Sequence, residues 1–150
     1  MEKQQMAENS RKEALYRKLV NAAVLDELKD KILYELVVKK KFKDVHCTAV
    51  KLAEELGTNT RYMSAVARVH FHMTFPALIN KYRVEEAMAL LADSRYADKN
   101  VDEIGYLAGF LHRQTFHVVF ANIVGTTPRG YRVEVARGKH MAEQPKSDKK

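Results

Sequence analysis

The chain has 150 residues, of which 46% are hydrophobic and 30% are charged. This length suits one domain or two small subdomains, and this composition excludes a disordered or collagen-like chain. The only cysteine, Cys47, cannot form an internal disulfide, and no run of 18 apolar residues occurs, so we expect a cytoplasmic protein with no membrane partner.

Positive charge is concentrated at the two ends of the chain. The net charge of +7 divides into +3 for residues 1–45, +1 for residues 46–134 and +3 for residues 135–150. An excess of basic residues indicates an anionic partner such as nucleic acid. A second interpretation is that the end charges only keep the chain soluble.

Helical periodicity runs along almost the whole chain, with apolar residues three and four positions apart. The pattern Ser10-Arg-Lys-Glu13 is typical of a capping box and predicts a helix that starts there and carries Leu15 to Ala23. A second apolar stripe predicts a helix of about four turns. Its members are Leu25, Leu28, Ile32, Leu33, Leu36 and Val37. The lysines of residues 39–43 suit its C-terminus.

Turn-forming residues divide the rest of the chain into further helices. Gly57, Gly109 and Gly125 are placed to end helices, because glycine tolerates the left-handed backbone that follows a helix end. Residues suited to start helices are Thr48, Thr58, Asn59, Thr60, Thr74, Asp98, Asn100 and Thr127. From Gly138 the tail is polar and charged, and we expect it to be disordered.

The middle of the chain contains one pattern twice. Leu52-Ala53-x-x-Leu56-Gly57 recurs as Ile104-Gly105-x-x-Ala108-Gly109, and Met63-x-x-Val66-Ala67 recurs as Phe116-x-x-Val119-Phe120. Each copy predicts a short helix, a turn and a second helix. This is the helix-turn-helix arrangement, whose second helix enters the major groove of DNA.

A long predicted helix joins the two copies. Residues 75–91 would span about 26 Å at the rise of an α-helix, and neighbouring major-groove faces on one side of B-DNA lie about 34 Å apart. With the packed helices at its ends, a helix of this length would hold two recognition helices in neighbouring grooves. A monomer would then read a long asymmetric site.

The second copy and the residues after it carry the most specific pattern of the chain. It consists of Asp102-Glu-Ile-Gly-Tyr-Leu-Ala-Gly-Phe110, then Phe116-x-x-x-Phe120, then Gly125-x-Thr127-Pro128-x-x-Tyr131-Arg132. The long helix adds Phe75-x-x-x-Ile79-x-x-Tyr82-Arg83-x-Glu85-x-Ala87. From roughly Asp26 to Val133, the chain resembles the DNA-binding domain of AraC/XylS-type transcription regulators.

This resemblance implies an all-α fold with two helix-turn-helix subdomains joined by a long linker helix. We expect an N-terminal helical extension (1–24), a first subdomain (25–72), the linker helix (73–93), a second subdomain (94–137) and a disordered basic tail (138–150). The implied protein is a bacterial transcription regulator that binds double-stranded DNA on the nucleoid and contacts RNA polymerase. Residues 1–24 are too few for a ligand-binding domain, and dimer contact, partner docking and simple packing remain open for them.

Helical spacing nominates the side chains that would touch DNA. On the first recognition helix they are Thr60, Arg61, Ser64 and Arg68, opposite the inward Met63, Val66, Ala67 and His70. On the second they are His112, Arg113, Gln114 and His117, opposite the inward Phe116, Val119, Phe120 and Ile123. Arg61 and Arg113 suit guanine and Gln114 suits adenine. Thr126 and Thr127 are weaker candidates for a phosphate contact, with helix capping as the alternative.

The chain departs from the family at five positions. The family often has Arg at the positions of Ala65 and Val118 and Lys at Ala121, and it usually has Gly at His72 and Ala at Gly105. The missing cations agree with the near-neutral middle of the chain. An alternative function is therefore a helical protein-interaction module that keeps the fold but binds DNA weakly or not at all.

No motif for catalysis or for a cofactor occurs in the sequence. The six histidines are scattered, and the spacings around His46-Cys47 and His70-x-His72 are not those of a zinc finger. No P-loop, dinucleotide-binding glycine pattern or nucleophile elbow is present. We therefore expect no enzyme activity, no metal site and no cofactor.

Overall fold

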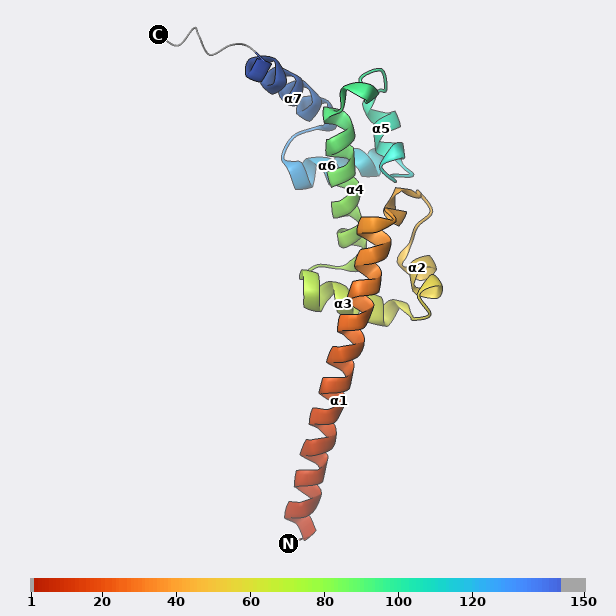
Figure 1. Cartoon of the computed structure of the whole chain (residues 1–150), viewed down its shortest axis with the longest axis vertical. Helices are drawn as coiled ribbons and strands as arrows, with labels where there is room; N and C mark the ends of the chain where they lie inside the picture. The colour runs from red at the N-terminus through yellow and green to blue at the C-terminus, as the bar shows by residue number, and fades with distance from the viewer. Residues whose placement is uncertain (1, 144–150) are drawn as a thin grey trace, which may run out of the picture. The chain divides into compact units, whose positions relative to one another are not determined.

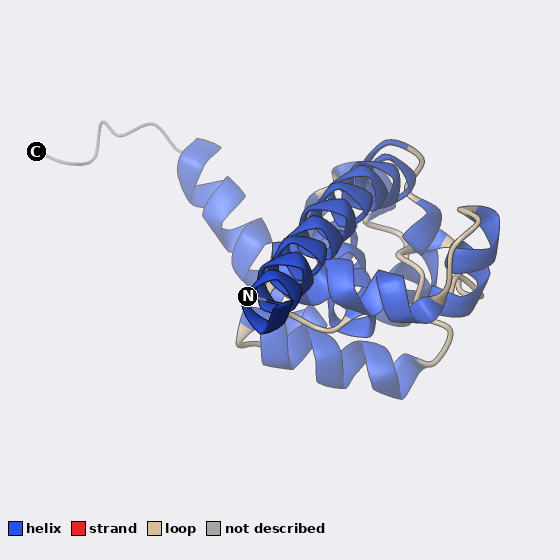
Figure 2. Ribbon diagram, turned by 90° about the horizontal axis from the view of Figure 1, so that it is seen from below, coloured by secondary structure: helices blue, strands red, loops and turns tan. Residues whose placement is uncertain are grey.

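The computed structural model describes residues 2–143, and these residues form helices joined by short turns, with no strand in this range (Figures 1 and 2). The α-helices are α1 (Glu2–Leu33), α2 (Ala49–Glu55), α3 (Thr60–Phe71), α4 (Phe75–Ala92), α5 (Val101–Leu107), α6 (Arg113–Val124) and α7 (Pro128–Glu143). A π-helical turn, η1 (Tyr34–Val38), follows α1, and η2 (Lys41–Lys43) and η3 (Ser94–Tyr96) are 3-10 turns. The predicted all-α fold class is confirmed. No helix in the described range is both long and apolar enough to cross a membrane.

The chain divides into two compact units. Of the described residues, unit 1 contains 2–39 and 49–75, and unit 2 contains 40–48 and 76–143. Each unit holds one helix-turn-helix, α2–α3 in unit 1 and α5–α6 in unit 2, and the long helix α4 joins them along the chain.

In unit 1, α3 packs against both α1 and α2. The buried side chains are Leu28 and Ile32 from α1, Leu36 from η1, Leu52 and Ala53 from α2, and Met63, Val66 and Ala67 from α3. The predicted inward face of α3 is thus confirmed. His70 is half-buried and its Nε2 lies 3.2 Å from Asp26 Oδ1 of α1, so this histidine joins two helices of the unit.

The start and the end of the first helix differ from the prediction. Helix α1 already runs at Glu2, so Ser10 lies inside it and does not cap it. The first residues are rich in Glu, Lys, Gln, Met and Ala, whose high helix propensity extends the helix without a cap. At the other end, Val37 is 52% exposed and Glu35 is buried. The π turn of η1 has more residues per turn and rotates these side chains away from the predicted stripe.

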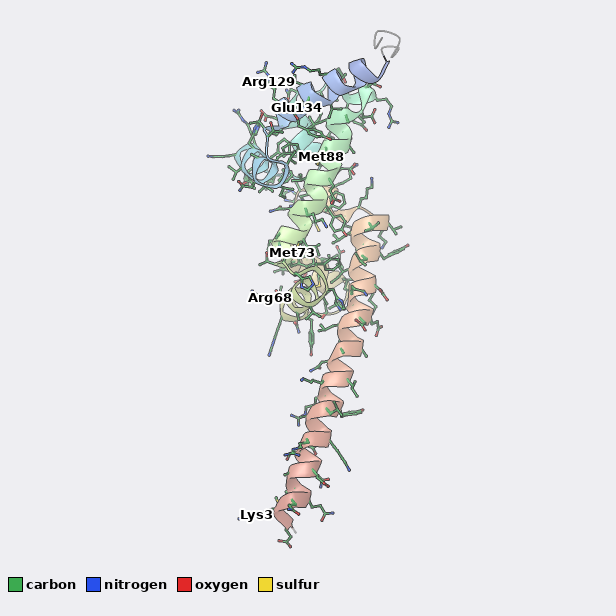
Figure 3. The ribbon with its side chains drawn as sticks, turned by 90° about the vertical axis from the view of Figure 1, so that its left-hand side faces the viewer. Lys3, Arg68, Met73, Met88, Arg129 and Glu134 are labelled. Carbon is green, nitrogen blue, oxygen red and sulfur yellow. The ribbon has the colours of Figure 1, made fainter. Side chains whose placement is uncertain are left out.

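The N-terminal part of α1 packs against no other described element of unit 1. No described side chain between residues 2 and 24 is buried. In Figure 1 this part of α1 continues well past α3, and Figure 3 shows its side chains standing out from Lys3 onward. The apolar Leu15, Tyr16 and Leu19 are 59%, 70% and 62% exposed.

In unit 2, α4, α5 and α6 surround a core of aromatic and aliphatic side chains. It contains Val84, Ala87, Leu90, Leu91, Ile104, Ala108, Phe110, Phe116 and Phe120. The Phe116 ring lies at its centre, 5.1 Å from the Phe110 ring and 5.7 Å from the Phe120 ring. Helix α7 packs on α6, where the Tyr131 and Phe120 rings meet edge to face.

Arg83 of α4 fixes the segment 40–48 to unit 2. Its guanidinium donates hydrogen bonds to the backbone carbonyls of Phe42 (2.8 Å), Asp44 (3.1 Å) and Cys47 (3.2 Å). Because burial penalises the charged form, the pKa of Arg83 is lowered from its ordinary value. Arg83 therefore binds three backbone groups of this segment, and Glu86 of the same helix adds ion pairs with Lys40 and Lys43.

The last helix is longer than predicted. Helix α7 continues through Gly138 to Glu143, where we expected a disordered tail to begin, and residues 144–150 lie outside the described range. Gly138 does not adopt the left-handed backbone that ends a helix. The residues that follow it are mostly good helix formers, which explains why the helix continues.

Candidate nucleic-acid interface

The first helix-turn-helix is built by local capping chemistry. After α2, Gly57 takes a left-handed φ of 69°, and the Thr58 N–H donates to the Ala53 carbonyl (2.9 Å). Asn59 then caps α3, because its side-chain oxygen accepts from the Tyr62 N–H (3.0 Å). These contacts fix where α3 begins and therefore which of its side chains face outward.

The outward face of α3 carries the predicted DNA-contacting residues. Thr60, Arg61, Ser64 and Arg68 are all exposed, whereas Met63, Val66 and Ala67 on the opposite side are fully buried. The structure therefore brings the nominated residues of the first helix to one accessible face. Ala65, where the family often has Arg, is half-buried on this helix.

The second helix-turn-helix repeats this construction with a stronger cap. Asn100 and Glu103 form a reciprocal capping box at the start of α5. Gly109 takes a φ of 114° after α5, and the Phe110 N–H donates to the Gly105 carbonyl (2.9 Å). Phe116 and Phe120 fix the inner face of α6, and both are fully buried. Ile123, predicted to point inward, is 50% exposed because it lies in the last turn of α6.

Three of the four nominated residues of the second helix are exposed at its N-terminal end. They are His112, Arg113 and Gln114. Arg113 and Gln114 line two shallow depressions of about 480 Å³ and 670 Å³, one shared with His117 and the other with Leu111 and Val118. The donor groups of Arg113 and Gln114 thus lie at open depressions on the surface of α6.

His117 differs from these three because it is half-buried and forms a short hydrogen bond within the protein. Its Nε2 shares a hydrogen bond of 2.7 Å with Asp102 Oδ1 of α5. The other carboxylate oxygen of Asp102 lies 3.4 Å from Arg113 Nε. Sequence reasoning missed Asp102, because it lies on the supporting helix. Its sequence signals are its place at the start of the family-like pattern and its acidic character in the first turn of that helix, and helix-dipole stabilisation explains the second equally well.

The two threonines before α7 have structural contacts. Thr127 Oγ1 accepts a hydrogen bond of 3.0 Å from the Gly130 N–H, which is the capping arrangement named as the alternative to phosphate binding. Thr126 is half-buried beside Gly130. Arg132 of α7 donates to the carbonyls of Lys99 (2.6 Å) and Tyr96 (3.0 Å), which ties α7 to the turn before α5.

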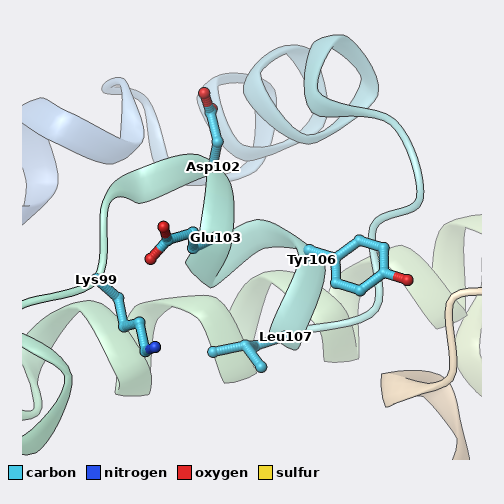
Figure 4. Close-up of a pocket in the computed structure, with 5 residues that line it drawn as sticks. All are labelled: Lys99, Asp102, Glu103, Tyr106 and Leu107. Atoms are coloured by element: carbon cyan, nitrogen blue, oxygen red, sulfur yellow. The ribbon is translucent and has the colours of Figure 1, made fainter.

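A further depression lies on the outer side of α5. It has a volume of about 420 Å³, and Figure 4 shows the five residues that line it: Lys99, Asp102, Glu103, Tyr106 and Leu107. The Asp102 carboxylate points away from the other four side chains. Among the described residues, no three His, Cys, Asp or Glu side chains lie close enough together to hold a metal ion.

Two departures from the family pattern lie where backbone conformation or packing restricts the choice of residue. His72, where the family usually has glycine, follows α3 with a left-handed φ of 57°, a conformation that glycine adopts at little cost. Gly105, where the family usually has alanine, lies directly under the Phe116 ring. A Cβ built at Gly105 would lie 2.7 Å from Phe116 Cγ.

The comparisons with known proteins agree with this construction. A family described as "Helix-turn-helix domain" matches residues 52–134. The C-terminal domain of the two-component response regulator yesN from Fusobacterium nucleatum is similar at a TM-score of 0.59 and 25% identity, over 69% of this chain and 97% of that one. An AraC-type transcriptional regulator from Chromobacterium violaceum is similar at a TM-score of 0.60 and 20% identity, over 74% of this chain and 95% of that one.

The C-terminal domain of AraT, a response regulator from Geobacillus stearothermophilus, is similar at a TM-score of 0.60 and 23% identity, over 74% of this chain and 84% of that one. Comparison with curated proteins gives no significant match. The family match covers more than half of the chain, and the structural matches show the same fold. The chain therefore belongs to the AraC-type helix-turn-helix family of DNA-binding transcription regulators.

Proposed function

We propose that this protein is a sequence-specific regulator that reads two adjacent major-groove segments of double-stranded DNA, one with α3 and the next with α6. The observation that carries this proposal is that one chain holds two helix-turn-helix units, each with a buried inner face and an exposed face bearing arginine. A major groove is wide enough to admit a helix, and arginine is the commonest reader of guanine. A monomer is the proposed DNA-binding form.

The contacts follow from the exposed side chains. Arg61 and Arg113 would bind guanine O6 and N7 with two hydrogen bonds, and Gln114 would bind adenine N6 and N7. Ser64 suits a base or a phosphate, and Arg68, one turn further along α3, suits a phosphate. The protein would act on the nucleoid in the cytoplasm, with RNA polymerase as a second partner.

A second candidate function is a helical interaction module with little affinity for DNA. The observation that favours it is the apolar outer face of α6, where Val118 is 55% exposed at a position that often carries Arg in the family. Such a module would bind another protein through the face that the main proposal gives to DNA.

Selection of bound fragments from random duplex DNA separates the two functions. The main proposal predicts enrichment of one asymmetric site that contains two specified segments. Their centres should lie about one helical turn apart, which is about 10 base pairs. Binding to that site should weaken steeply with salt, because each phosphate contact releases counterions. A pool without enrichment, together with a flat salt dependence, would favour the interaction module.

A further inference from the structure

Asp102 belongs to the supporting helix α5, yet its carboxylate contacts α6. One oxygen lies 2.7 Å from His117 Nε2 and the other lies 3.4 Å from Arg113 Nε. The Arg113 side chain is otherwise 78% exposed, whereas Asp102 is 41% exposed. The two residues that Asp102 contacts both line the depression that also includes Gln114. A single carboxylate therefore touches two of the four residues nominated on this helix.

The geometry leaves the base-reading part of Arg113 available. A guanidinium has five N–H donors, and the carboxylate lies against the Nε side. The two terminal nitrogens stay free to reach the O6 and N7 of guanine. An exposed arginine that is not held must lose side-chain freedom on binding, which costs about 0.5–1.5 kcal/mol for such a side chain. A residue that holds it in place removes part of that cost.

The charge of Asp102 acts in the opposite direction on binding to DNA in general. A carboxylate on the α6 face repels phosphates and offsets one of the few cations there. The charge of Asp102 should therefore lower the affinity for every DNA sequence. Its contact with Arg113 should separately favour the sequence that Arg113 reads. Only the orientation of Arg113 increases discrimination between sequences, because the charge weakens binding to all of them alike, and neither effect requires Asp102 to touch DNA.

We propose that Asp102 is a positioning residue that sets base preference by orienting Arg113 and His117 on the α6 face. This inference rests on the proposed function. The test replaces Asp102 by asparagine in the full chain and measures binding to the selected site, to the same site with the Arg113 base pair changed, and to unrelated duplex DNA. We expect Asp102→Asn to reduce the preference for the selected base pair by about 2- to 10-fold, while binding to unrelated DNA stays equal or becomes tighter.

Two further variants exclude simpler explanations. Glu103→Gln removes the same charge from the same helical turn and keeps a capping-box side chain. Because the Glu103 carboxylate accepts its hydrogen bonds from Asn100 at the start of α5, the base preference of this variant should match that of the unmodified protein. In a background that carries both Arg113→Ala and His117→Ala, Asp102→Asn should no longer change base preference. A change that persists there would show that Asp102 contacts bases itself, and the inference would be wrong.

The remaining outcomes separate this inference from the proposed function. An unmodified protein that enriches no sequence would overturn both. Enrichment by the unmodified protein together with an unchanged preference in Asp102→Asn would overturn the positioning role alone. Equal weakening on every sequence, with a lower melting temperature than Glu103→Gln, would show that Asp102 only stabilises unit 2 and would also overturn it.

Discussion

Replacement of Gly105 by alanine tests how closely α5 and α6 pack. Gly105 lies inside α5 with a helical backbone, so alanine is compatible with its conformation. A Cβ at this position would lie 2.7 Å from Phe116 Cγ and 2.8 Å from Cε2. Phe116 is fully buried between the rings of Phe110 and Phe120, so it cannot move without displacing them.

Two opposing contributions decide the sign of the effect. Alanine gains about 0.5–1 kcal/mol over glycine in a helix interior, because it restricts the unfolded chain and forms helix more readily. Forcing an extra methyl group into a packed core costs about 1–3 kcal/mol. The expected net loss is about 1–2 kcal/mol of unfolding free energy, which lowers the melting temperature by roughly 2–8 °C for a chain of this size.

Urea denaturation followed by circular dichroism measures this loss, and the chain offers a matched control. Gly138 lies in α7 with no atom within 4 Å of an added Cβ, so Gly138→Ala should show the helix-propensity gain without the clash. Replacing the Phe116 ring by the smaller leucine side chain should relieve the clash. Gly105→Ala should therefore cost less unfolding free energy in a Phe116→Leu background than alone. If Gly105→Ala were as stable as Gly138→Ala, the packing argument would be wrong.

Four further predictions concern recognition and stability. Arg113→Ala should cost about 1–3 kcal/mol of binding free energy at one base pair, and equal loss on all sequences in a binding assay would show a phosphate contact only. His72→Gly should raise unfolding free energy by about 0.5–1 kcal/mol, because it relieves a left-handed backbone. Arg83→Lys should lower it by about 1–3 kcal/mol, because lysine cannot reach three carbonyls at once. Deleting residues 2–14 should leave the melting temperature nearly unchanged, since no described side chain there is buried; a large fall would reveal packing of that segment.

The sequence predicted the parts of this fold that local chemistry decides. Gly57, Gly109 and Gly125 all take a positive φ after the helices they were expected to end. The inward faces of α3 and α6 followed from helical spacing, because a side chain every three or four residues must lie on one side of a helix. The same spacing identified Arg61 and Arg113 as outward residues.

The parts that sequence reasoning missed depend on contacts between elements. Periodicity shows which face of α5 is inward, but it does not show which α6 side chain meets Asp102, 15 residues before His117. It also does not show that residues 40–48 pack with unit 2, where they contact Arg83 and Glu86 of α4. The π turn after α1 was also not predicted, because the apolar spacing fits a regular helix and does not show that Val37 turns outward and Glu35 inward.

The charge distribution and the proposed role of Asp102 lead to one consistent account of recognition. Residues 46–134 carry a net charge of only +1, so their attraction to DNA of any sequence is weak, although each phosphate contact at the bound site still releases counterions. A protein with weak general affinity must gain its binding energy at the few base contacts it makes. Such contacts are most effective when the side chain is already oriented, because less freedom is lost on binding. The carboxylate beside Arg113 would provide this orientation, and its negative charge would weaken binding to DNA of every sequence. The missing cations therefore agree with a selective regulator as well as with a lost DNA-binding function, and the base preference of Asp102→Asn distinguishes the two.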